Sequence, residues 1–397
     1  MRIIYYSPHP THDIVSEVGY ATHQREVILA LRSLGHEVFP VIMGGTEVAN
    51  LNAFATDNYK IPFYKKFLKI LIPRFLWTSL NNYKLIRHDL KAARILQENI
   101  LKIKPDLIYE RSEYLQDSGA KLANKYKIKY FIEVNAPFIE EMNVFEGYSL
   151  FHSKAHKIEA FKLNAADKVF TVSTALKDFL VTRYNCVSDK IIVQPNCINP
   201  EKIKLNSPLV NSLKGDLKLN TEKVIGFVGS MFPYHGVDIL INAFSKVVKE
   251  HPGSKLLIIG DGIVLSDLKE LTHNLSLDNS VVFTGKIPHS LVFNYIQLMD
   301  ICIMAKSNWY GSPVKIFEYG LLKKPIIAPD NIPVRDAMVN MQDAILIQEN
   351  ESELKIAICN LLENETLAES LAINFYKKVM ENYKWENAAE KIIESCV

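Results

Sequence analysis

Residues 224–248 read VIGFVGSMFPYHGVDILINAFSKVV, and this stretch decides the fold class. A short β-rich run ends at Val228, a turn extends from Gly229 to Gly236, and apolar residues at helical spacing follow. A strand, a glycine-bounded turn and an amphipathic helix, in this order, make up the repeating unit of a parallel sheet. The sequence therefore predicts an α/β fold.

The same alternation of β-rich runs and amphipathic helical stretches continues along the chain, six times in each half. It predicts two Rossmann-like domains, which suits a chain of 397 residues because one compact core rarely grows so large. In the first half we expect strands at residues 3–6, 38–43, 107–110, 130–134, 169–172 and 191–193. In the second half we expect them at residues 224–228, 256–259, 281–283, 301–304, 326–328 and 345–347.

Proline, glycine and polar residues gather in the segment 199–222, which we therefore interpret as the linker between domains 1–199 and 200–380. In open parallel sheets, ligands bind beyond the carboxyl ends of the strands. Glycine turns and helix N-termini there favour a phosphate-bearing ligand. Two such edges facing each other would form an inter-domain cleft.

Composition excludes several classes of partner and site. The formal charge of +2 does not favour nucleic acid as a partner. The five cysteines show no spacing typical of a zinc site, so no metal is predicted. The opening MRIIYYSPHP runs directly into a strand pattern without a signal-peptide core, and no apolar run is long enough to span a bilayer. We expect a cytoplasmic protein.

The turn GSMFPYHG, residues 229–236, is the first candidate phosphate site. A glycine removes the side chain that would block a diphosphate, and the helix start carries a partial positive charge. His235 lies immediately before that helix and could donate to a phosphate oxygen. An ordinary βα loop with a solvent-exposed histidine is an equally good interpretation of these residues alone.

The second candidate is GSPVKIFEYG, residues 311–320. We expect Ser312 to cap a helix and Pro313 to occupy its first turn. Lys315 and Glu318 then lie on one helical face, where the carboxylate could accept ribose hydroxyls and the lysine could meet phosphate. The alternative is an exposed pair of little energetic weight.

A third, weaker candidate is IIGDG, residues 258–262, in which a strand ends in the turn Gly260–Asp261–Gly262. Such a turn approaches the ligand edge of any Rossmann-like sheet. Its presence alone does not identify a site.

The segment YKIPFYKKFLKILIPRFLW, residues 59–77, combines five Lys/Arg residues with aromatic residues and leucines and contains no acid. This mixture suits an interfacial segment lying on anionic lipid. The alternative is an excursion between two strands that packs on its own domain with a basic outer face.

Five stretches of the second half resemble, in the same order, the C-terminal domain of the retaining glycosyltransferases of family 4, which have the GT-B fold. These stretches are VGSMFPYHGVDILINAF, LLIIGDG, VVFTGKIP, DICIMA and SPVKIFEYGLLKKPIIA. Four stretches of the first half are similar to their N-terminal domain, namely GYATHQREVILALRSLGHEV, EVNAPFIEE, TVSTALKDFL and QPNCINP. KWENAAEKII resembles their closing helix, which implies that residues 381–397 cross back onto the first domain. The resemblance covers nearly the whole chain.

This resemblance implies that the C-terminal domain binds a nucleotide sugar, with a UDP- or GDP-sugar as our first expectation. It also implies that the N-terminal domain binds the acceptor, which we expect to be a saccharide, a lipid-linked molecule or a small molecule. Glu318 matches the glutamate that holds the donor ribose, Gly19 matches the loop that closes on the phosphates, and Ile287 lies in the loop that contacts the base. The other donor-binding positions expected are Gly229, Ser230, Gly236, Gly260, Asp261, Gly262, Gly311, Ser312, Pro313 and Val314.

The chain departs from the family pattern at several functional positions. Ser230 and His235 stand where an arginine and a lysine are usual, Tyr310 replaces the first of two paired glutamates, and Asn135 replaces a histidine. The chain is therefore either a divergent active branch or a degenerate copy. The retained glycines, together with Lys315, favour the active branch.

Transfer places negative charge on the leaving diphosphate, which preorganised positive groups stabilise. The candidate catalytic residues are His235, Lys315, Arg111 and Asn135. The family implies retention of anomeric configuration, and because no metal-ligand cluster is visible in the sequence we expect metal independence. Cell-surface polysaccharide or glycolipid assembly is our expected role, with small-molecule glycosylation second. The alternatives are a non-hydrolysing sugar-nucleotide epimerase and an inactive nucleotide-sugar-binding protein.

Overall fold

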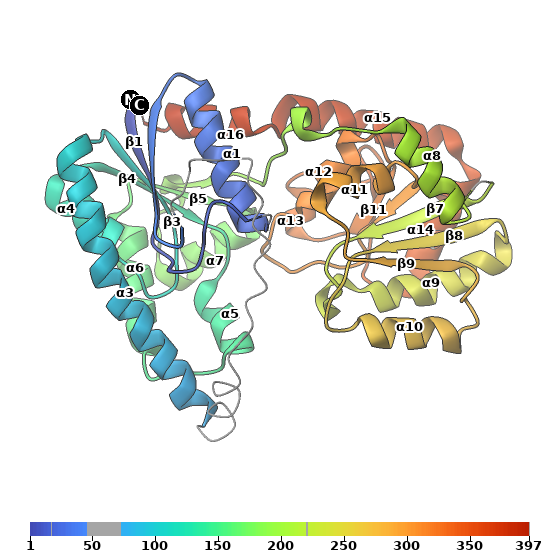
Figure 1. Ribbon diagram of the computed structural model, residues 1–397, viewed down its shortest axis with the longest axis horizontal. Helices are drawn as coiled ribbons and strands as arrows, with labels where there is room; N and C mark the ends of the chain where they lie inside the picture. Colours follow the sequence, from blue (N-terminus) through green and yellow to red (C-terminus); the bar gives the residue numbers. More distant parts are fainter. Residues whose placement is uncertain (17, 46–72, 220, 397) are drawn as a thin grey trace. The chain divides into compact units, whose positions relative to one another are not determined.

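The computed structural model describes residues 1–16, 18–45, 73–219 and 221–396 (Figure 1). The chain divides into two compact units, Met1–Gln194 with Trp385–Val397, and Pro195–Lys384. Each unit holds one six-stranded parallel sheet, and every strand expected from the sequence is present. The prediction of two Rossmann-like α/β domains is confirmed.

Unit 1 has the strand order β2-β1-β3-β4-β5-β6. Its strands are β1 Arg2–Ser7, β2 Glu37–Ile42, β3 Leu107–Arg111, β4 Lys129–Val134, β5 Lys168–Thr171 and β6 Ile191–Val193. Its helices are α1 Gly19–Ser33, α3 Arg74–Ile103, α4 Ser118–Tyr126, α5 Phe138–Phe145, α6 His152–Ala165, α7 Thr174–Tyr184 and α16 Trp385–Glu394.

Unit 2 has the strand order β12-β11-β10-β7-β8-β9. Its strands are β7 Lys223–Val228, β8 Ser254–Ile259, β9 Val281–Gly285, β10 Ile301–Ile303, β11 Ile326–Pro329 and β12 Ile345–Ile347. Its helices are α8 Ser207–Asp216, α9 Val237–Glu250, α10 Leu265–Asn274, α11 His289–Ile296, α12 Val314–Leu321, α13 Ile332–Arg335, α14 Glu351–Glu363 and α15 Glu365–Asn382.

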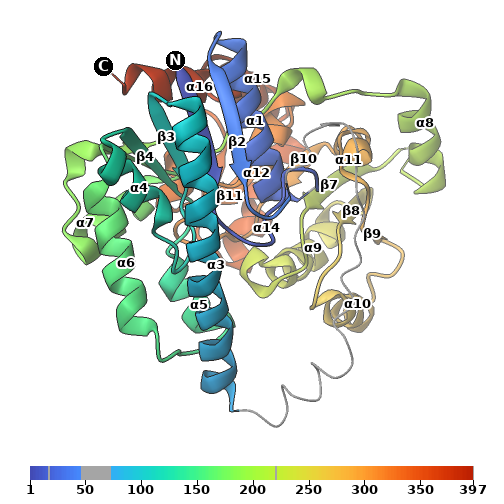
Figure 2. The same ribbon diagram turned by 60° about the vertical axis from the view of Figure 1, so that its left-hand side comes forward.

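Alternate residues of the central strands of unit 2 enter two separate cores, because successive side chains point to opposite faces of a sheet. Ile225 and Phe227 pack under helices α9, α10 and α14, whereas Val224 packs under α11, α12 and α15. Figures 1 and 2 show these helices on the two faces of the sheet. Burial on both faces explains why the strands are continuous apolar runs.

The strand orders place a topological switch point in each unit. In unit 2, β7 and β10 are neighbours, and the chain continues from them toward opposite edges of the sheet. In unit 1, the corresponding neighbours are β1 and β3. Ligands of open α/β sheets bind at the carboxyl ends of such neighbours. The turns after β7 and β10, and after β1 and β3, are therefore the places to look for sites.

The linker predicted at residues 199–222 is wrong, because the chain passes between units at Gln194 and Pro195. The predicted linker contains helix α8, and Asn206 caps it by accepting a hydrogen bond from the Leu209 amide at 3.0 Å. Leu219 is fully buried in the core of unit 2. The proline and glycine that suggested a linker lie at the two ends of this helix instead.

The segment predicted to contact lipid, residues 59–77, lies mostly outside the described residues, which resume at residue 73. Among the described helices, none combines the length and apolar character needed to cross a membrane.

Candidate functional site

The turn after β7 is built around a glycine whose backbone conformation and neighbours disfavour a side chain. Gly229 has φ 155°, and a Cβ on it would lie 2.7 Å from Lys315 Nζ, on helix α12. Gly236, at φ 63°, forms the N-cap of α9. Backbone in this conformation strongly favours glycine. The turn therefore brings bare backbone close to a lysine from the other side of the switch point.

Lys315 presents a buried amine at this turn. Its Nζ lies 4.2 Å from the centroid of the Phe227 ring and has no hydrogen-bond partner among the residues that the structure describes. Burial lowers the pKa of Lys315 to about 7, although the nearby Glu318 carboxylate acts in the opposite direction. A buried, unpaired cation is costly, and a bound anion would offset that cost.

His235, in the short turn Pro233–His235, also lies near Phe227, with ring centroids 5.9 Å apart. Its Nε2 is 3.4 Å from Ser230 Oγ, and Nδ1 has no hydrogen-bond partner within the described part of the chain. Burial, and then the positive charge of Lys315, lower the pKa of His235 to about 3. The histidine is half-buried and neutral near pH 7, which rules out the solvent-exposed loop residue considered above.

Glu318 lies one turn further along α12 and is only 8% exposed. Its Oε1 is 3.2 Å from Nε2 of His289, the first residue of α11. Ile287, two residues before this histidine, packs against the core of unit 2. Lys315 and Glu318 are thus both buried, and the alternative of an exposed pair is wrong. His289 was missed, since only its proximity to the expected base-contacting loop could have indicated it.

The predicted cap at Ser312 is wrong. Pro313 is the N-cap residue of α12, without a side-chain cap. The Ser312 hydroxyl instead accepts from the Asn196 amide at 3.0 Å, and the Ser312 carbonyl accepts from Asn196 Nδ2 at 2.7 Å. Gly311 donates its amide to Asn308 Oδ1 at 2.7 Å. Two asparagine side chains therefore fix the entry to α12.

The third motif packs directly on the first. A Cβ on Gly260 would lie 1.9 Å from the Gly229 carbonyl oxygen, and one on Gly262 would lie 2.5 Å from the Met231 carbonyl oxygen. Between them, the Asp261 carbonyl accepts from the Met231 amide at 2.9 Å. These glycines allow two βα turns to lie against each other, which is a structural role at the edge of the site.

In unit 1, the two predicted catalytic residues meet at a carboxylate that was not predicted. Glu133 Oε1 accepts from Asn135 Nδ2 at 2.5 Å and from Arg111 Nη1 at 3.1 Å. The same oxygen lies 2.8 Å from Nε2 of His23. Glu133 Oε2 accepts from the Tyr109 hydroxyl at 2.8 Å. One carboxylate near the end of β4 thus orients residues from β3, from α1 and from the turn that follows β4.

Although burial alone would raise the pKa of Glu133, the charges of His23 and Arg111 and the hydrogen bonds from His23 and Asn135 lower it to about 2. The carboxylate is therefore ionised throughout the physiological range. The pattern EVNAP was visible in the sequence, but a glutamate inside a strand does not reveal its partners. Gly19 begins α1, four residues before His23, and a Cβ on it would meet nothing within 4 Å.

Comparisons with known proteins bear on both units. A family model described as Glycosyltransferase Family 4 matches residues 19–202, and one described as Glycosyl transferases group 1 matches residues 222–364. The chain is 24% identical to an uncharacterised glycosyltransferase of Methanocaldococcus jannaschii, with 99% of this chain and 97% of that protein covered. It is 25% identical to the alpha-monoglucosyldiacylglycerol synthase of Streptococcus pneumoniae, with 92% and 82% covered.

Among solved structures, Anabaena Alr3699/HepE in complex with UDP has a TM-score of 0.72 at 15% identity, with 100% of this chain and 99% of that chain covered. The same protein in complex with UDP-glucose has a TM-score of 0.68 at 16% identity and the same coverage. These likenesses show that the fold is shared over the whole chain.

Proposed function

The chain belongs to the GT-B glycosyltransferases of family 4, and we propose that it moves a hexosyl group, with retention of configuration, from a nucleotide sugar to an acceptor hydroxyl. The observation that carries the proposal is the buried Lys315 amine beside the Gly229 turn, at the switch point of unit 2. A leaving diphosphate is the anion that this reaction supplies. Its binding there would pair the lysine and stabilise the charge that develops during transfer.

The donor is assigned to unit 2. Lys315 and His235 contact the diphosphate, Glu318 accepts from the ribose hydroxyls, and the base lies near Ile287. The complexes of HepE with UDP and UDP-glucose support a UDP-sugar as the first choice, with a GDP-sugar second. In this proposal protein groups bind the diphosphate, and no metal is assigned to it.

The acceptor is assigned to unit 1. Arg111 and Asn135, both held by Glu133, orient the acceptor. The hydroxyl attacks the face from which the diphosphate departs, and the diphosphate accepts its proton. This sequence of events gives retention without a second carboxylate on the opposite face.

An apolar surface on unit 1 supports a lipid-linked acceptor. Helix α3 and the segment 144–150 are joined where Thr78 Oγ1 donates to the Glu146 carbonyl at 2.6 Å and the Leu150 amide donates to Ser79 Oγ at 2.9 Å. Large apolar side chains from both elements are exposed by 38–73%, namely Phe75, Leu76, Leu80, Tyr83, Val144, Phe145, Tyr148 and Leu150. Contiguous exposed apolar surface typically marks an interaction site.

A hollow of about 510 Å³ opens on this surface and is lined mainly by apolar side chains of α3 and by Leu150 and Phe151. The basic sequence of residues 59–77 leads directly into α3. We propose that the apolar surface contacts an anionic bilayer and that the acceptor is a lipid or a lipid-linked saccharide. The name of the S. pneumoniae relative, a synthase of a glucosylated diacylglycerol, is consistent with this class of acceptor.

Incubating the protein with UDP-glucose, UDP-N-acetylglucosamine or GDP-mannose, each with and without diacylglycerol in micelles or a membrane lipid extract, tests the reaction. We expect nucleotide release that depends on acceptor, and a product whose anomeric proton signal matches the configuration of the donor. Epimerisation of a donor without acceptor, or an inverted product, would refute the proposal.

A further inference from the structure

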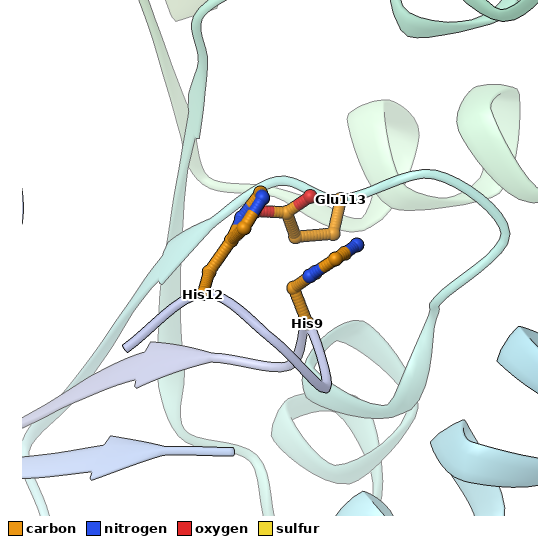
Figure 3. Close-up of side chains that lie close together, drawn as sticks. All are labelled: His9, His12 and Glu113. Carbon is orange, nitrogen blue, oxygen red and sulfur yellow. The ribbon is translucent and has the colours of Figure 1, made fainter. Parts of the chain in front are cut away.

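We propose that His9, His12 and Glu113 form a binding site for a divalent transition metal of the zinc class, at the carboxyl edge of the sheet in unit 1 (Figure 3). Each side chain offers one ligand atom, and these atoms lie within 4.8 Å of one another. The histidines follow β1 and the glutamate follows β3. The sequence did not indicate this site, because His12 and Glu113 lie 101 positions apart.

The location favours a ligand. The turns after β1 and β3 flank the switch point of this sheet, where open α/β folds bind their ligands. Neither histidine takes part in the cluster around Glu133, which lies at the ends of β3 and β4. The His9–His12–Glu113 group is thus a second cluster along the same edge.

Hydrogen bonds to the backbone fix the turns that follow β1 and β3. The carbonyl of Pro8 accepts from His88 Nε2 at 3.1 Å and from Gln116 Nε2 at 3.0 Å. The carbonyl of Glu113 accepts from the buried Lys162 Nζ at 2.8 Å. Such outer contacts fix the backbone that carries the ligands, as they do in established metal sites.

The ligand set selects the metal. Two imidazoles and one carboxylate suit zinc and its neighbours in the transition series, whereas magnesium prefers oxygen ligands. Glu113 is only 3% exposed, but both histidines are partly exposed, which leaves room for a water or a substrate oxygen as a further ligand. Three protein ligands with an open position are typical of catalytic rather than structural zinc sites.

Binding requires small movements. His12 Nδ1 lies 2.6 Å from Glu113 Oε1, whereas two ligands of a tetrahedral zinc lie about 3.4 Å apart. The His9 ring stacks on His12 with centroids 3.7 Å apart, so it must turn its edge toward the ion. Both residues lie between the end of β1 and the start of α1, outside regular structure. Metal binding must also replace two existing contacts, the hydrogen bond that His9 Nδ1 accepts from the Thr11 amide at 3.3 Å and the stacking of His12 on Tyr20 with centroids 4.3 Å apart.

Cobalt(II) is a suitable probe, because its visible absorption reports the ligand set. We expect tag-free protein, stripped with a chelator, to bind one equivalent of Co²⁺ with strong visible bands, to release it to Zn²⁺, and to ignore Mg²⁺. The variants His9→Ala, His12→Ala and Glu113→Gln should each weaken Co²⁺ binding at least about tenfold. His152→Ala is the matched control, because His152 and His156 form another close pair, with Nε2 atoms 3.2 Å apart.

Absence of Co²⁺ bands in the wild type, unchanged affinity in the three variants, or loss of the bands in His152→Ala would overturn the proposal. Thermal unfolding without metal shows whether each variant folds, and His9→Ala, in a loop, gives a readout even if Glu113→Gln unfolds. The measurement needs no sugar transfer, so its outcome is independent of the proposed reaction.

Discussion

Lys315 and His235 place two ionisable groups beside the turn after β7, and the pKa of each lies below its usual value. Burial lowers the pKa of Lys315 from 10.5 to about 7. Between these two pH values the unfolded chain holds a proton that the folded protein has lost, so the free energy of unfolding without ligand rises with pH across that window. A bound diphosphate favours the charged lysine. The affinity of the protein for the diphosphate should therefore be highest below about pH 7 and should fall as the pH rises above 7.

The role of His235 is tested by two substitutions. His235→Lys places an amine where related enzymes carry one and should keep most of the turnover. His235→Ala removes the contact and should lower kcat by about 100-fold, the typical cost of losing one group that stabilises a developing anion. Steady-state kinetics of both variants with saturating donor decide it. Equal rates for His235→Ala and wild type would exclude the role.

Glu133 acts through the residues that it holds. Glu133→Gln removes the charge that orients Arg111 and His23, and we expect kcat to fall about 100-fold while the donor KM stays unchanged, since the donor is assigned to the other unit. Glu98→Gln, on the exposed face of α3, is the control and should behave as wild type. A rise in donor KM without loss of kcat would contradict the assignment.

At the scale of elements, the sequence predicted every strand because hydrophobic runs and glycine turns are local signals. The sequence did not predict the helix cap and the domain boundary, because contacts between residues far apart in the chain override local signals there. Ser312 has the side chain of a helix cap, yet its hydroxyl bonds to Asn196, 116 residues earlier. Likewise, Pro208 and Gly215 suggested a linker but belong to helix α8, which contacts α11 of unit 2.

The turn after β7 is the element on which the donor site depends. Gly229→Ala would force a Cβ to within 2.7 Å of Lys315 Nζ at φ 155°, and we expect it to lower stability by about 1 kcal/mol and donor affinity at least tenfold. Gly253→Ala is the matched control, since a Cβ there meets nothing within 4 Å. Calorimetric titration with UDP measures the difference. Equal affinity in both variants would show that the turn does not contact the phosphates.

At the scale of the molecule, each sheet carries a polar cluster at its switch point. The positions of these clusters follow from the order of the strands in each sheet, and sequence patterns do not reveal that order. The sequence predicted that ligands bind at the carboxyl edges but not which turns meet. Pairing β1 with β3 and β7 with β10 brings together Glu113 with His12, and Lys315 with Gly229.

Membrane contact is a property of the whole chain, and liposome flotation tests it. We expect wild type to float with vesicles containing phosphatidylglycerol but not with pure phosphatidylcholine vesicles, because basic residues near a surface contribute about 1 kcal/mol each on anionic lipid. A variant with Lys65, Lys66 and Lys69 changed to Glu should stay at the bottom of the gradient. Flotation equal to that of wild type would exclude the proposed contact.

The central claim is that a sugar nucleotide binds through the Lys315 amine. A thermal-shift screen against UDP-, GDP- and ADP-sugars tests it directly, because a ligand that binds only the folded state stabilises it by mass action. We predict a saturable rise in Tm with at least one donor, larger at pH 6.5 than at pH 8.5. Lys315→Met should lose this rise while raising the Tm of the unliganded protein. No shift with any donor, or an equal shift in Lys315→Met, would contradict the account.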